Sequence, residues 1–145
     1  MENYDPQLTA RVWKRVTGET AEVHPDLQRL IEDALADAAA YLHLSRFFRN
    51  PYDRILRQMH RQEQSHAACL KGIYRMRTGK RYVPKLPKPL REKPLLTLQR
   101  CYERELRRVS AYTAAAADPR FGQSFTRMAQ QEQEHCRILL ELLGK

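Results

Sequence analysis

The sequence has few cysteines, few glycines and no long apolar run. Its three cysteines, Cys69, Cys101 and Cys136, are widely spaced and form no Cys-x-x-Cys pair, which argues against a disulfide scaffold, a zinc ribbon and a rubredoxin-type iron centre. No stretch of 18 or more apolar residues is present, so we expect no membrane span. The first residues contain no apolar segment of the kind that a secretion signal needs, and a cytoplasmic protein is therefore expected.

What is present is typical of one soluble globular domain. The chain has 145 residues, of which 42% are hydrophobic and 30% charged. Its net charge is +9, and nine basic residues fall between Lys71 and Lys93. Such a segment could contact nucleic acid, but no recognition motif or pattern of stacking aromatics accompanies it. The sequence therefore favours a solvated basic loop over a DNA-associated bundle.

Helix-forming residues dominate, and prolines divide them. Asn50-Pro51 and Asp118-Pro119 each place a capping side chain before a proline at a first helical position. We therefore expect an all-α single domain over 1–145. Its expected parts are an N-terminal segment (1–23), which docks through Leu8, Val12, Trp13 and Val16, and helices at about 25–49, 51–78, 94–117 and 119–143.

The connections between these helices predict the topology. The first two helices are joined by almost nothing, and so are the last two, so each pair should form an antiparallel hairpin. Between the pairs lies a proline-broken polar stretch, 79–93. Extended, it reaches roughly 50 Å, at about 3.3 Å per residue. A 27-residue helix is only about 40 Å long, so the stretch can cross the whole bundle.

An internal repeat indicates which faces are buried. The segment MHRQEQSH (59–66) matches MAQQEQEH (128–135) at five positions after a shift of 69 residues. Four-three spacing, the period of a bundle seam, runs through the last three predicted helices. The residues on these stripes are Tyr52, Leu56, Met59, Glu63, His66, Leu70 and Ile73; Leu95, Leu98, Tyr102, Glu105, Val109, Tyr112 and Ala116; and Phe121, Phe125, Met128, Glu132, His135, Leu139 and Leu142.

The polar residues on these stripes predict a metal site. Glu63, Glu105 and Glu132 would meet His66 and His135 at one level of the interior. A buried carboxylate needs a partner, and no lysine or arginine falls on the three stripes. A divalent metal would supply the missing charge, and Glu and His at i and i+3 can reach one ion. In the alternative reading, Glu–His hydrogen bonds satisfy the cluster without metal.

With these motifs, the chain resembles the ferritin-like superfamily, specifically rubrerythrin-type di-iron domains. The resemblance covers about 120 residues, from Leu27 to Leu143, and lacks the rubredoxin domain. It implies a ferritin-like four-helix bundle with a long crossover. The motifs that carry it are Glu63-x-x-His66, Glu105 followed by Tyr112, and Glu132-x-x-His135.

The resemblance implies a role for each ligand. Glu63 and Glu132 would bridge two metals, His66 and His135 would be terminal ligands, and Glu105 would cap one metal. The expected cofactor is iron, as two ions or one per chain, with manganese or zinc as alternatives.

The chain departs from this pattern in the first helix. Tyr41 and Tyr112 are the expected second-shell donors, or simply core aromatics in the alternative reading. Seven residues before Tyr41, where the family has Glu, stands Ala34, which cannot bind metal. Asp37, one turn further along, could substitute directly or through water, or could instead be solvated. Because the position served by His66 loses a carboxylate, the position of His135 and Glu105 is expected to load first.

Another departure concerns redox chemistry, because Arg108 stands where rubrerythrins carry an additional Glu. The resemblance implies a cytoplasmic oxidoreductase of peroxidase or ferroxidase type, a homodimer with an unidentified electron donor. The alternative is a non-enzymatic relative with one structural metal or none.

Overall fold

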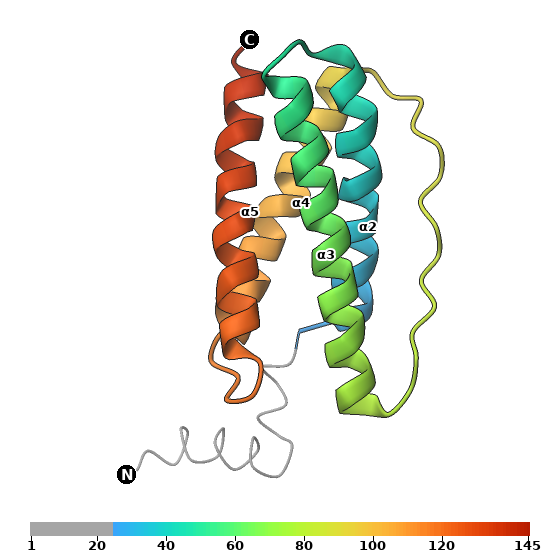
Figure 1. Ribbon diagram of the computed structural model, residues 1–145, viewed down its shortest axis with the longest axis vertical. Helices are drawn as coiled ribbons and strands as arrows, with labels where there is room; N and C mark the ends of the chain where they lie inside the picture. Colours follow the sequence, from blue (N-terminus) through green and yellow to red (C-terminus); the bar gives the residue numbers. More distant parts are fainter. Residues whose placement is uncertain (1–24) are drawn as a thin grey trace.

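The computed structural model describes residues 25–145 and is all-helical there, with no strand (Figure 1). The predicted N-terminal segment, 1–23, lies outside the described residues. The elements are α2 (Leu27–Leu44), which continues into the short 3-10 helix η2 (Ser45–Phe47), then α3 (Tyr52–Thr78), α4 (Pro94–Ala115) and α5 (Gly122–Leu143).

Local signals explain several helix ends. The Asp26 side chain accepts the backbone N–H of Arg29 at 3.2 Å and caps α2. Pro94 opens α4, where its missing N–H costs nothing. Gly79 ends α3 with φ of 73°, a left-handed conformation that suits glycine. The prediction that Asn50 caps the next helix is wrong, because Pro51 holds the capping position and no side chain caps α3.

The turn before α5 depends on Asp118. Its carboxylate accepts the backbone N–H groups of Arg120 and Phe121 at 2.7 and 2.8 Å. The same carboxylate pairs with Arg77 at the end of α3. Asp118 therefore ties the α4–α5 turn to the neighbouring hairpin.

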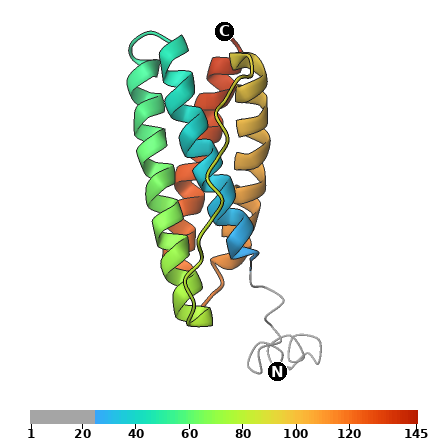
Figure 2. The ribbon, with the colours of Figure 1, turned by 90° about the vertical axis from the view of Figure 1, so that its right-hand side faces the viewer.

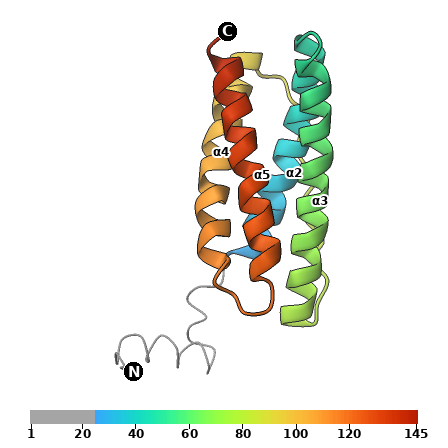
Figure 3. The same ribbon diagram turned by 60° about the vertical axis from the view of Figure 1, so that its left-hand side comes forward.

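The helices form a four-helix bundle of two hairpins, as expected from the connection lengths. α2 lies beside α3, and α4 lies beside α5 (Figure 3). The 79–93 crossover runs lengthwise over the outer side of α2 (Figure 2). Tyr82 anchors it by donating a hydrogen bond to Glu32, and Leu90 packs on the core.

The core consists of two apolar clusters. One contains Leu30, Leu70 and Phe125, and the other contains Leu44, Leu56 and Leu139. Nine polar or charged residues within 25–145 are also buried, and seven of them gather at mid-bundle height on the four helices. These seven are Asp37, Glu63, His66, Glu105, Arg108, Glu132 and His135.

The predicted stripes are right on two helices and displaced on the third. In α3 and α5 every stripe residue is buried except Tyr52 and Phe121 at the helix starts, which are half-buried. In α4, Leu98, Glu105 and Tyr112 are buried as expected. The other positions are displaced, since Cys101, Arg108 and Ala115 are buried, Tyr102, Val109 and Ala116 are only partly buried, and Leu95 is exposed. The expectation that no lysine or arginine faces the buried glutamates is wrong, because Arg108 does.

Candidate metal centre

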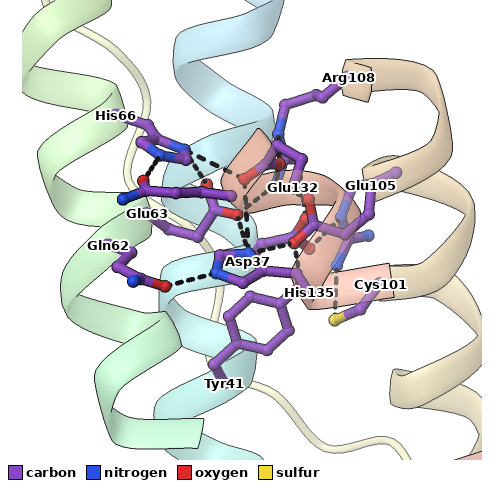
Figure 4. Close-up of polar contacts among 12 residues, drawn as sticks. Asp37, Tyr41, Gln62, Glu63, His66, Cys101, Glu105, Arg108, Glu132 and His135 are labelled. Atoms are coloured by element: carbon purple, nitrogen blue, oxygen red, sulfur yellow. Dashed lines mark hydrogen bonds and ion pairs between the residues drawn. The ribbon is translucent and has the colours of Figure 1, made fainter. Parts of the chain in front are cut away.

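The five side chains predicted to bind metal lie together at the bundle centre (Figure 4). α3 supplies Glu63 and His66, α4 supplies Glu105, and α5 supplies Glu132 and His135. All five are 0–3% exposed. Each Glu-x-x-His pair spans one turn, so both side chains of a pair reach the same level of the interior.

Both histidines point Nδ1 at the carboxylates. Nδ1 of His135 lies 2.9 Å from Glu105 and 3.1 Å from Glu63. Nδ1 of His66 lies 3.1 Å from Glu132 and 3.4 Å from Glu63. Each ring therefore offers the same nitrogen to the centre, one ring from each hairpin.

Two glutamines fix these ring orientations. The Nε2–H of His135 donates to Oε1 of Gln62 at 2.7 Å, and that of His66 donates to Oε1 of Gln131 at 2.5 Å. Each glutamine immediately precedes the motif glutamate of the opposite hairpin. With Nε2 holding a proton, Nδ1 can face a carboxylate only if it is itself protonated or binds a metal. Outer hydrogen bonds of this kind are usual for metal-binding histidines.

Arg108 supplies a cation that the predicted stripes did not contain. Its side chain is fully buried and reaches from α4 into the carboxylates (Figure 4). Nη2 lies 2.7 Å from Glu63, 2.9 Å from Glu105 and 2.7 Å from Glu132. Nη1 lies 2.7 Å from Asp37. One guanidinium thus contacts all four buried carboxylates.

Asp37 is buried beside the centre and is not solvated, and its ion-pair partners are arginines. Its Oδ1 accepts from Nε of Arg104 at 2.6 Å, and its Oδ2 faces Arg108. Arg104 also contacts Sγ of Cys101 at 3.6 Å. Asp37 on α2 therefore forms ion pairs with Arg104 and Arg108 on α4, beside the Glu/His cluster.

The two tyrosines have different environments. The Tyr41 hydroxyl donates to Oε2 of Glu105, and its ring meets His135 edge-on with 5.7 Å between centroids. Tyr41 thereby orients the carboxylate of Glu105. Tyr112 packs edge-on against His66 at 6.2 Å, but its buried hydroxyl has no hydrogen-bond partner within 25–145.

The electrostatics of the cluster follow from burial and from Arg108. Burial alone would raise the pKa of Glu63 and Glu132, but the Arg108 charge together with the His135 and His66 side chains holds both below their usual range. Burial, together with the Glu63 charge, raises the pKa of Glu105 well above normal. Burial would lower the pKa of His66, but the carboxylates of Glu132 and Glu63 beside its Nδ1 raise it to about 9. The centre therefore favours positive charge on its nitrogens.

The cluster lacks positive charge when every carboxylate is ionised. Four carboxylates, including Asp37, are matched by only two permanent positive charges, those of Arg104 and Arg108, which leaves two positive charges to be supplied. Protons on His66 and His135 would supply them. A single divalent metal with both histidines neutral would do so equally.

Part of this cluster could hold a metal ion. Donor atoms of Glu63, Glu105, Glu132 and His135 all lie within 4.8 Å of one another. Carboxylate oxygen and imidazole nitrogen suit iron, manganese or zinc, so the donor set does not indicate the metal.

Three of the residues that shape this site were not assigned from the sequence. Gln62 and Gln131 carried a signal, because both positions are identical in the repeat. Arg108 was visible only as a departure from the family pattern. Its distance of three residues from Glu105 is the same helical spacing that joins each Glu to its His.

No family model, curated protein or solved structure matches this chain. Among the residues described by the structure, no helix has the length and apolar character needed to cross a membrane.

Proposed function

We propose that the chain is a ferritin-like protein that binds a divalent transition metal at its bundle centre. The observation that carries the proposal is the pair of buried histidines whose Nδ1 atoms face carboxylates, while a glutamine oxygen holds Nε2 of each ring. This arrangement prepares two nitrogen lone pairs for a cation. Two histidines used only for packing would not need matched hydrogen bonds from opposite hairpins.

The proposal covers metal binding and does not extend to two-metal oxidation. A bound iron or manganese ion would supply redox chemistry, and by resemblance the two-electron reactions of rubrerythrin-type domains use two adjacent irons. Arg108 brings a permanent charge within 2.9 Å of Glu63 and Glu132, which two metals would share, and of Glu105, which would cap one of them. A second divalent ion would meet strong repulsion at this distance.

Metal analysis of the purified protein tests the proposal. The chelator-treated protein is dialysed against Mn²⁺, Fe²⁺ (without oxygen), Co²⁺ or Zn²⁺, desalted, and its metal content measured by mass spectrometry. We expect one ion per chain for at least one metal, and loss of that ion in Glu132→Gln. Glu134→Gln, an exposed position two residues away on α5, is the matched control and should bind as the native chain does. Native protein that retains none of the four metals would contradict the proposal.

A second candidate function follows from Arg108 alone. If the guanidinium and two protonated histidines satisfy the carboxylates, the chain is a metal-independent helical bundle. The same dialysis separates the candidates. A metal-independent bundle retains no metal, and its melting temperature is the same with and without chelator, whereas a metal that binds only the folded state raises the melting temperature.

A further inference from the structure

Each motif glutamate turns one oxygen toward Arg108 and the other toward His66. Oε2 of Glu63 and Oε2 of Glu132 lie 2.7 Å from Nη2 of Arg108. Oε1 of each faces Nδ1 of His66, at 3.4 and 3.1 Å, and Oε1 of Glu132 also lies 3.4 Å from Nδ1 of His135. A carboxylate that bridges two metals divides its oxygens between them in this way. Here one of the two partners is a guanidinium.

Arg108 has the surroundings that a metal beside His135 would have. Its Nη2 contacts Glu63, Glu105 and Glu132, the three carboxylates of the four-residue group that also contains His135. Nδ1 of His135 is hydrogen-bonded to Glu105 and Glu63, so this side of the cluster already has its partners.

The side of the cluster at His66 lacks partners. Nδ1 of His66, Oε1 of Glu63 and Oε1 of Glu132 are buried and have no hydrogen-bond partner among the described residues. The Tyr112 hydroxyl, on the ring packed against His66, is also buried and has no hydrogen-bond partner among these residues. Buried polar atoms are rarely left unpaired, and a nitrogen and two carboxylate oxygens that face one another would all be satisfied by one cation.

We infer that Arg108 takes the place of one ion of a two-metal centre, and that the chain binds its single metal through His66, Glu63 and Glu132. This assignment rests on the proposed metal-binding function. It fits the charge of the cluster with every carboxylate ionised, because one divalent ion then supplies the two missing positive charges and two ions would exceed them. Three protein donors also leave coordination positions for water or a small ligand.

The metal position inferred from the structure, at His66, is the opposite of the one that the sequence favoured. Because Ala34 removes a carboxylate, the sequence favoured the position of His135 and Glu105 for the first metal. Arg108 lies among the carboxylates of that position and leaves the His66 position as the one with free donors.

Metal titration of two matched histidine variants tests the assignment. Co²⁺ is titrated into the native protein, His66→Gln and His135→Gln, with binding followed by visible absorption. His66→Gln should weaken binding by more than about a hundredfold, beyond the range seen when a supporting residue is lost. His135→Gln should weaken it by less than about tenfold, which is below the range seen when a supporting residue is lost. His60→Gln, on α3 but outside the cluster, is the control, because its Nδ1 contacts only the Ala38 carbonyl.

The stoichiometry provides a second test that needs no histidine variant. Native protein should bind one Co²⁺ per chain, and Arg108→Gln, which removes the charge, should bind two. Greater loss of binding in His135→Gln than in His66→Gln, or two ions bound by the native chain, would overturn the assignment while leaving metal binding intact. No binding of any metal would refute the proposed function itself.

Discussion

Replacing Arg108 should strongly destabilise the metal-free protein. Its guanidinium contacts Asp37, Glu63, Glu105 and Glu132, all fully buried, so Arg108→Met would leave these carboxylates without their common cation. Removing one partner of a buried ion pair costs about 3–5 kcal/mol. That is a large part of the roughly 5–15 kcal/mol by which domains are stable.

The loss should be measured by chemical and thermal unfolding at pH 7 with chelator present, followed by circular dichroism. At about 2–4 °C per kcal/mol for a chain of this size, the melting temperature should fall by about 6–20 °C. Arg107→Met, the exposed neighbour on α4, is the control and should change stability by less than about 0.5 kcal/mol. A loss below about 1 kcal/mol for Arg108→Met would refute the view that this side chain neutralises the cluster.

Two further predictions concern the glutamines and the α4–α5 turn. Gln131→Leu removes the acceptor that orients His66 and should weaken metal binding by about 10–100-fold. Gln62→Leu removes the acceptor of His135 and should weaken metal binding less. Competition with a coloured chelator measures both affinities. Asp118→Ala should cost about 1 kcal/mol at pH 7 by urea unfolding. Partial burial would raise the Asp118 pKa, but the backbone N–H groups of Phe121 and Arg120 hold it below normal. The stabilisation by Asp118 is therefore fully present above its unfolded-state pKa and is lost as pH falls through its folded-state pKa. The difference between native and variant protein should therefore shrink toward pH 3; a constant difference would contradict this role.

Much of the fold could be predicted from the sequence, because local signals and spacing agree there. Proline positions and the short and long connections predict the hairpins and the crossover. In α3 and α5, the apolar residues and the Glu-x-x-His motifs share one face, so a single choice of stripe explains both.

The α4 face could not be chosen in the same way. Two seams pass through Leu98, Glu105 and Tyr112, and hydropathy favours the one with Val109 over the one with Arg108. The structure buries Arg108 because carboxylates from α2, α3 and α5 surround it. These contacts come from residues distant in sequence, so the periodicity of α4 alone cannot predict that Arg108 is buried. The sequence analysis was right that the buried glutamates need positive charge, but Arg108 of the chain itself supplies part of that charge.

The most direct measurement is an anomalous difference map from crystals of the native protein grown with Mn²⁺. The account predicts one peak per chain, bound by Nδ1 of His66 and Oε1 of Glu63 and Glu132, with the Arg108 guanidinium still against Oε2 of both glutamates. A peak beside His135 with Arg108 displaced, or two peaks in one bundle, would contradict it.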